Sequence, residues 1–210
     1  MSKVVFLLEE PSLKEFLDNY LPRLLPDLDF LCVKHEGKQD LEQSIPRKLR
    51  AWQDATFIVV RDNDGAKCKD LKARLADLCT QGNRPDTLVR LACEESESWY
   101  LGAPEALAAA YAEPAIFDIA RKAKFRNPDA LGSPSRELSL LVPEFRKIDG
   151  ARRMGKVMPT DATANRSHSF RVFVEGVCRI ARAQGHTCLA REGMQPRTVQ
   201  ASLLSEAKEE

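Results

Sequence analysis

Apolar and polar residues alternate along the first half of the chain in blocks that suit strands and helices in turn. Short apolar runs rich in β-branched residues are typical of strands buried on both faces, and they cover residues 3–8, 30–34, 56–60 and 87–93. Between these runs, apolar residues recur at helical spacing after Ser12, Lys38 and Cys68. This order predicts βαβ units and therefore a parallel sheet.

Local signals give the expected ends of the first helices. Ser12 and Glu15 have the spacing of a capping box, and Pro22 is expected to close the first helix. Pro46 is expected to kink or divide the second helix.

Beyond about residue 97 the pattern is helical only. The expected helices cover residues 104–112, 115–124, 135–142 and 168–183, with Pro- and Gly-bearing loops at 127–134 and 148–165. From Gln184 onward there is no clear period, which suggests a loosely held tail. The predicted organisation is an α/β core at residues 1–103, a helical extension packed on it at 104–183, and a tail at 184–210.

Composition narrows the class of protein. Hydrophobic residues make up 43% of the 210, enough for a compact core, and a net charge of +1 argues against a polybasic binder. The first apolar run stops at Glu9, too early for a signal peptide or a membrane span. Six cysteines without a CxxC pair indicate a reducing compartment. These features predict a cytoplasmic protein.

Carboxylates follow three of the four predicted strands. They are Glu9 and Glu10, then Asp62 and Asp64, then Glu94, Glu95 and Glu97. Since the carboxyl ends of parallel strands share one edge, these acids would repel each other unless a cation lies among them, and Mg²⁺ or Mn²⁺ prefers such oxygen ligands. Asp62 and Asp64 would point the same way in an extended backbone and could share one ion. The alternative for each acid is a turn-forming or helix-capping role.

The same residues carry a family resemblance. Glu9 after one strand and Asp62-Asn63-Asp64 after another resemble the Toprim domain of topoisomerases, primases and OLD-type nucleases. The segment 9–16 is similar to the E-G-x-[ST]-[DE]-x-x-F start of small stand-alone Toprim proteins, but it has Glu10 where Gly is usual and Leu13 where an acid is usual.

Three further segments resemble the OLD and RloB-like group, a family of unknown function often paired with ATPases. Residues 97–101 (ESWYL) are similar to its E-x-W-x-L segment, and residues 35–38 and 165–170 are also similar to that group.

The resemblance implies a Toprim-like Rossmannoid sheet of four parallel strands with a C-terminal helical extension. It also implies a divalent-metal-dependent endonuclease that hydrolyses phosphodiester bonds, working as effector of an ATPase-containing phage-defence system. Catalytic and metal-binding roles then fall on Glu9, Asp62 and Asp64, and a second Mg²⁺ or Mn²⁺ ion would use Glu97 and Glu94.

Basic residues could hold the phosphates of a nucleic acid. Seven Lys and Arg residues against two Asp residues occupy positions 145–171, and the candidates for phosphate contact there are Lys147, Arg152, Arg153 and Arg166. Lys38 follows a Gly turn after the second strand, on the same edge as the acids. The alternative is an ordinary solvated helix face or loop. The expected partners are nucleic acid, DNA before RNA, and an ATPase protein, with no membrane.

Two other functions stay open at this stage. The chain could be a non-catalytic Toprim-fold regulatory or interaction subunit of such an ATPase, which the departures at Glu10 and Leu13 favour. A receiver-like phosphoacceptor also has paired acids after its first strand, but it needs a fifth strand ending in Lys, and no strand is predicted after Cys93. The three histidines lack metal-ligand spacing, and capping or surface roles are expected for them.

Overall fold

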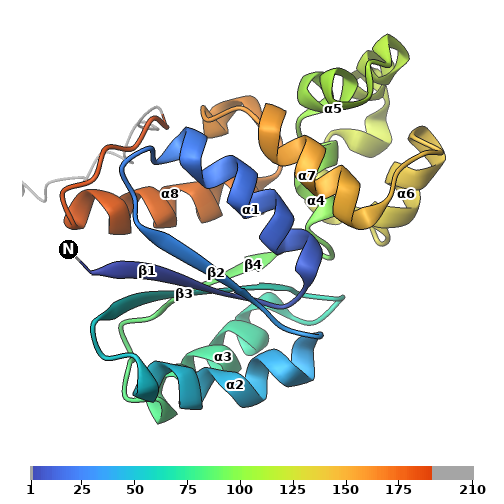
Figure 1. The fold of residues 1–210 in the computed structure, drawn as a ribbon. Coiled ribbons are helices and arrows are strands. Elements are labelled where there is room, and N and C mark those ends of the chain that lie inside the picture. Colours follow the sequence, from blue (N-terminus) through green and yellow to red (C-terminus); the bar gives the residue numbers. More distant parts are fainter. Residues whose placement is uncertain (1, 191–210) are drawn as a thin grey trace, which may run out of the picture.

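The computed structural model of the chain describes residues 2–190 and has an α/β fold in three layers (Figure 1). The middle layer is a parallel sheet of four strands in the order β2-β1-β3-β4. The strands are β1 (Lys3–Leu8), β2 (Phe30–Lys34), β3 (Ala55–Asp62) and β4 (Leu88–Ala92). The predicted fold class is confirmed.

The pairing register brings three strand ends to one edge. Leu8 at the end of β1 lies beside Val60 of β3 and Lys34 of β2, and Asp62 at the end of β3 lies beside Ala92 of β4. The winding reverses between β1 and β3, and ligands of open α/β sheets bind at such a switch point.

Helices cover both faces of the sheet because the strands are apolar on both sides. Helices α2 (Lys38–Ala51) and α3 (Cys68–Gln81) cover one face, and α1 (Pro11–Leu24) and α8 (His168–Ala183) cover the other (Figure 1). Alternate residues of each strand therefore enter two separate cores.

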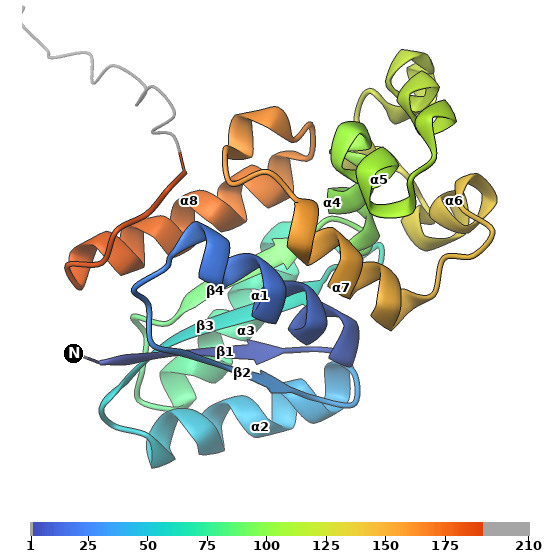
Figure 2. The ribbon, with the colours of Figure 1, turned by 45° about the horizontal axis from the view of Figure 1, so that its top comes forward.

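The remaining helices extend the α1 and α8 side beyond the sheet (Figure 2). They are α4 (Glu97–Leu101), α5 (Pro104–Tyr111), α6 (Pro134–Leu141), α7 (Lys147–Val157) and the 3₁₀ segments η1 (Pro114–Arg121), η2 (Ala123–Phe125), η3 (Pro128–Ala130) and η4 (Ala162–Ala164). Helices predicted at 104–112, 135–142 and 168–183 are present within a residue at each end, and the one predicted at 115–124 is 3₁₀ instead.

Helix α7 corrects the sequence prediction, which had a loop at 148–165. Gly150 and Gly155 disfavour a helix by propensity, yet both are needed for packing. A Cβ at Gly155 would lie 2.5 Å from the carbonyl oxygen of Phe16, and one at Gly150 would lie 2.8 Å from the Tyr111 hydroxyl. Gly155 therefore lets α7 lie directly against α1, as Figure 2 shows, and Gly150 lets α7 pack closely on Tyr111 at the end of α5.

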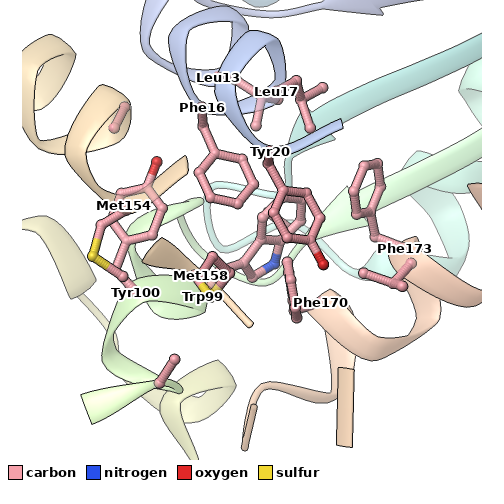
Figure 3. Close-up of a cluster of buried hydrophobic side chains, with 14 of the residues drawn as sticks. Leu13, Phe16, Leu17, Tyr20, Trp99, Tyr100, Met154, Met158, Phe170 and Phe173 are labelled. Atoms are coloured by element: carbon pink, nitrogen blue, oxygen red, sulfur yellow. The ribbon is translucent and has the colours of Figure 1, made fainter. Parts of the chain in front are cut away.

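An aromatic cluster joins the sheet to the helical part (Figure 3). Phe16 and Tyr20 of α1 stack on each other, Trp99 of α4 stacks on Phe173 of α8, and Phe170 contacts both pairs. Large rings buried in this way stabilise the fold by roughly 2–3 kcal/mol each. The helices after residue 103 therefore share one core with β1 and α1.

Three local predictions were wrong. Ser12 donates to the Glu10 carboxylate at 2.5 Å and makes no capping box with Glu15, because the helix begins at Pro11 with Glu10 at its N-cap. Pro22 does not close the first helix, because α1 continues to Leu24. Pro46 does not divide the second helix, because α2 runs unbroken from Lys38 to Ala51.

The end of the described chain returns to the fold. The Leu189 nitrogen donates to the Leu24 carbonyl at 2.9 Å, and Cys178 and Cys188 form a disulfide that their spacing had not predicted. The prediction of a tail concerns mainly 191–210, outside the described residues. Within 2–190, no helix has the length and apolar character needed to cross a bilayer.

Candidate functional site: the acidic edge of the sheet

Two groups of carboxylates meet at the carboxyl edge of the sheet, one on each face. Strand alternation directs Arg61 toward α2 and Asp62 toward α1 and α4. We call the α2 side the Glu9 group and the α1 side the Asp62 group. The Glu9 group comprises Glu9, Asp64, Lys38 and Arg61. The Asp62 group comprises Asp62, Glu10, Glu97 and Lys147.

In the Glu9 group, an arginine and a lysine accompany the two acids. Arg61 Nε lies 3.5 Å from Glu9 Oε2, and the Arg61 guanidinium also pairs with Glu42 of α2. Lys38 Nζ lies 3.6 Å from Asp64 Oδ2, which places Lys38 on the edge where the sequence predicted it. Burial and the nearby Asp64 raise the pKa of Glu9, while Arg61 opposes that rise.

In the Asp62 group, three acids surround one lysine. Lys147 Nζ lies 2.7 Å from Glu10 Oε2 and 4.0 Å from Glu97 Oε1. Glu97 is only 1% exposed, and its Oε2 has no hydrogen-bond partner. Lys147 comes from the first residue of α7, so the helix missed in the sequence delivers the cation that this group needs.

The pKa values of this group reflect burial among like charges. Burial, with Glu10, Glu97 and Glu9 nearby, raises the pKa of Asp62 well above its ordinary value. Burial raises the pKa of Glu97 to about 7 even though Lys147 opposes the shift. Burial lowers the pKa of the Lys147 ammonium. The nearby carboxylates of Glu97 and Glu10 outweigh burial, so the net effect is a raised pKa. Three carboxyl groups thus share one ammonium, and their crowding favours protonation of Asp62 and Glu97.

The two groups are connected at the end of β3. The backbone nitrogen of Asp62 donates to Glu9 Oε2 at 3.2 Å. Because the Asp62 carboxylate is a few bonds from its own nitrogen, the Glu9 and Asp62 carboxylates lie within about 8 Å of each other. This is inside the roughly 10 Å that a shared two-metal site allows.

The turn after β3 departs from the extended geometry assumed for Asp62 and Asp64. Strand β3 ends at Asp62, and Asp64 adopts the left-handed conformation with φ 47°. The two carboxylates therefore belong to different groups, Asp62 with Glu97 and Asp64 with Lys38. Glu94 is also left-handed, with φ 58°. Non-glycine residues in this region are uncommon and cluster at functional sites.

Hydrogen bonds hold this turn against the end of β4. Asn63 donates its nitrogen to the Ala92 carbonyl at 3.0 Å, and its side-chain oxygen accepts from the Glu94 nitrogen. The Asp64 nitrogen donates to the Glu94 carbonyl at 3.2 Å. Glu94 Oε2 would lie 3.8 Å from a Cβ at Gly65, so the Glu94 side chain covers the turn. Glu95 instead caps α6, accepting from the Ser135 nitrogen at 2.6 Å.

The other predicted phosphate-binding residues lie outside these two groups. Arg152 Nε pairs with Glu15 of α1 at 3.0 Å. Arg153 Nε pairs with Asp149 at 2.7 Å, and its guanidinium lies over the Tyr111 ring. The Arg166 nitrogen donates to the Gly102 carbonyl just after α4. The predicted basic residues therefore divide between the acidic edge and the helical part.

The family-like segments at 97–101 and 165–170 are joined by a polar network. Trp99 Nε1 donates to Ser169 Oγ at 2.9 Å, and Asn165 Nδ2 donates to the Trp99 carbonyl at 2.8 Å. Asp129 accepts from the Ser169 nitrogen and from the Ser167 hydroxyl. These residues fix α8 and η3 against α4 and so hold Glu97 in place. His35 is also structural, because Nδ1 bonds the Leu8 carbonyl and Nε2 bonds Ser44.

The donor chemistry of the edge fits an oxygen-ligated dication. The buried Glu97 oxygen lacks a partner, and the carboxylates raise each other's pKa values. As the side chains stand, no three His, Cys, Asp or Glu residues of the described chain converge closely enough to hold a metal ion. The ammonium groups of Lys38 and Lys147 lie among the acids instead.

Sequence reasoning missed three residues of the edge. Arg61 could have been predicted from strand alternation, because alternation places Arg61 on the opposite face of the sheet from Asp62 and on the same face as Glu9. Glu10 was listed among the acids of the edge but was given no role in the site, yet it binds Lys147. Tyr100 had no signal, and its buried hydroxyl near Glu97 lacks a hydrogen-bond partner.

Comparison with known proteins gives one family match. Residues 8–177 match the model described as "Domain of unknown function (DUF4276)". No protein of curated function matches the chain.

Two solved structures are similar in fold. One is the C-terminal region of the Burkholderia pseudomallei OLD protein, with 13% identity, a TM-score of 0.44, and coverage of 84% of this chain and 98% of that one. The other is the C-terminal region of the Xanthomonas campestris pv. campestris OLD protein, with 11% identity, a TM-score of 0.42, and coverage of 85% and 98%.

Proposed function

From the acidic edge of this chain, which belongs to the DUF4276 family of unknown function, we propose a divalent-metal-dependent nuclease acting on phosphodiester bonds. The single observation that carries the proposal is the Glu9–Asp62 contact at the switch point, with Glu97 buried and unpartnered beside it. Acids crowded in this way repel each other, so a bound cation would stabilise them.

The chain's own residues would divide the work between ion binding and proton transfer. Asp62 and Glu97 of the Asp62 group, together with Asp64 of the Glu9 group and Glu94 on the turn, would hold Mg²⁺ or Mn²⁺. Glu9 would act as ligand or proton acceptor, because burial and Asp64 raise its pKa toward the range useful for proton transfer. When bound, the ion would polarise the phosphate and stabilise the attacking and leaving oxygens.

The two lysines of the edge would change partners when metal and phosphate bind. Lys147 is 44% exposed at its side chain and Lys38 is 56% exposed, so both can swing away from the carboxylates. Each would then have an ammonium free to contact a phosphate oxygen. Arg61 has no such freedom, because its side chain is 6% exposed and paired with Glu9 and Glu42. Arg61 would position Glu9.

The helical part would hold the nucleic acid, through Arg152, Arg153 and Arg166. Arg152 and Arg153 project from α7, the helix that begins at Lys147, so phosphates along one strand could contact α7 and the edge together. We also propose that the substrate is DNA, that the chain works with an ATPase partner, and that it acts in phage defence.

One observation favours the alternative of a non-catalytic regulatory subunit. Lys38 and Lys147 already neutralise part of each acidic group without any ion. A fold that binds a partner through this edge, with its lysines as permanent counter-charges, would have the same contacts. A metal requirement distinguishes the two functions.

The test is nicking of a supercoiled plasmid and cleavage of labelled single strands by the purified chain, with and without a candidate ATPase encoded beside it. We expect cleavage with Mg²⁺ or Mn²⁺ and none with a chelator or with Asp62→Asn. No cleavage under any of these conditions would favour the regulatory subunit.

A further inference from the structure

Two free cysteines lie beside the turn that carries Asp64. Cys68 is exposed at the first residue of α3, and Cys93 is half-buried directly after β4. The other free cysteines of the described chain, Cys32 and Cys79, are buried in the two cores. Peroxides and alkylating reagents can therefore reach Cys68 far more easily than they reach Cys32 or Cys79.

The Asn63 side chain links the Cys68 sulfur to the backbone directly after Cys93. Its Nδ2 donates to Cys68 Sγ at 3.3 Å, and its Oδ1 accepts from the nitrogen of Glu94, the residue that follows Cys93. Strand alternation places Cys93 on the same face of the sheet as Val89 and Leu91, which is the face covered by α3, the helix that begins at Cys68. Asn63 is 5% exposed, so this arrangement is part of the packed structure and does not depend on a mobile surface contact.

We propose that Cys68 and Cys93 are an oxidation site, converted by hydrogen peroxide or an organic hydroperoxide into an intramolecular disulfide. The Cys68 sulfur attacks the peroxide, the O–O bond breaks, and Cys68 becomes a sulfenic acid as water or an alcohol leaves. The Cys93 sulfur then attacks the Cys68 sulfur, the S–O bond breaks, the S–S bond forms and water leaves. One peroxide accepts the two electrons that two thiols lose.

The local structure assigns the two roles. Cys68 meets the oxidant first because it is exposed, and Cys93 resolves the sulfenic acid because it is shielded but adjacent. The new bond would tie the start of α3 to the end of β4 and so close a covalent ring around the turn at 63–65. That turn is already held by the hydrogen bonds of Asn63 and Glu94.

The experiment maps disulfides in the purified full chain after brief exposure to equimolar hydrogen peroxide. Free thiols are alkylated, and peptides are analysed by mass spectrometry without reduction. We expect a Cys68–Cys93 peptide as the main new product, removed by dithiothreitol, while Cys32 and Cys79 stay alkylatable. The covalent readout is independent of any nuclease activity.

Two single variants check the roles. In Cys93→Ser, Cys68 should be trapped as a sulfenic acid by dimedone and then gain further oxygen. In Cys68→Ser, peroxide should oxidise the Cys93 thiol at least about tenfold more slowly than in the wild type, as measured by the fraction of Cys93 that can still be alkylated. The wild type alone can overturn the proposal, if Cys68 becomes sulfinic acid while Cys93 stays alkylatable, or if Cys68 pairs with another cysteine.

Discussion

The backbone nitrogen of Asp62 donates a hydrogen bond to the carboxylate of Glu9 at 3.2 Å, across the switch point between β1 and β3. This contact joins two acids from opposite faces of the sheet. It also fixes Glu9 by a backbone group that every substitution at position 62 except proline retains. Variants at position 62 therefore change the charge of the site without releasing Glu9.

Asp62→Asn should separate metal binding from folding. In the wild type we expect saturating Mg²⁺ or Mn²⁺ to raise the melting temperature by about 5 °C, because the ion binds the native state only. Asp62→Asn should abolish most of that rise and should melt somewhat higher than the wild type in a chelator, since a buried charge is removed. Asp77→Asn, an exposed acid on α3, is the control and should respond like the wild type. An unchanged metal response in Asp62→Asn would count against the site.

Glu97→Gln should change how stability depends on pH in the absence of metal. The folded-state pKa of Glu97 is raised to about 7 from 4.5, so the folded state binds a proton that the unfolded state has released between those values. The wild type should therefore lose stability as pH rises from about 4.5 to 7, by roughly 3 kcal/mol from this group. Glu97→Gln should match the wild type at pH 4.5 and exceed it at pH 8, in chemical denaturation with a chelator. Equal stability at pH 8 would refute the assignment.

The strands and the position of the site could be predicted because each depends on local sequence. The run TFIVV at residues 56–60 is buried on both faces and leads directly into Asp62, and parallel strands must end at one edge. The approach of Glu9 to Asp62 follows from that topology once β1 lies beside β3.

The parts that could not be predicted depend on contacts distant in sequence. Helix α7 contains Gly150 and Gly155, which read locally as loop residues, and only the approach of Phe16 and Tyr111 explains them. Lys147 was predicted as a phosphate contact, but its carboxylate partners could not be assigned while its helix was unknown. The left-handed Asp64 had no local signal apart from the Gly that follows it.

Gly155→Ala should destabilise the protein by about 2 kcal/mol, although alanine favours helices. The added Cβ would lie 2.5 Å from the Phe16 carbonyl oxygen, and backbone on the α1 side cannot give way as a flexible side chain would. Gly132→Ala is the matched control, because nothing lies within 4 Å of its Cβ, and it should change stability by less than about 0.5 kcal/mol. Urea denaturation measures both. Similar midpoints for the two variants would contradict the close packing of α7 on α1.

Lys147→Met should make the fold more dependent on metal. The substitution keeps most of the apolar stem but leaves Glu10, Glu97 and Asp62 without their ammonium. In a chelator the variant should melt below the wild type at pH 8, and the difference should shrink at pH 5 as carboxylates protonate. Mg²⁺ should raise its melting temperature by more than it raises that of the wild type. Lys156→Met, near the other end of α7, is the control. A smaller metal response in Lys147→Met would show that Lys147 helps the ion to bind.

Glu9→Gln and the pair Arg152→Ala with Arg153→Ala should separate catalysis from binding. Glu9→Gln keeps shape but removes a proton acceptor or ligand, so cleavage should fall at least about a hundredfold. Its affinity for nucleic acid should stay the same or rise, because one negative charge leaves the edge.

The double arginine variant should do the reverse, with weaker binding and a salt dependence flatter by about one unit of slope per lost phosphate contact. Arg152 and Arg153 are paired with Glu15 and Asp149, so their removal also leaves two acids uncompensated and adds to the loss of affinity. Arg50→Ala, on α2 at the opposite face of the sheet, is the control and should bind and cleave like the wild type. The measurement is the cleavage rate and the dissociation constant of each variant across a salt series. Wild-type cleavage by Glu9→Gln would remove Glu9 from the mechanism, and unchanged affinity in the double variant would move the binding surface away from α7.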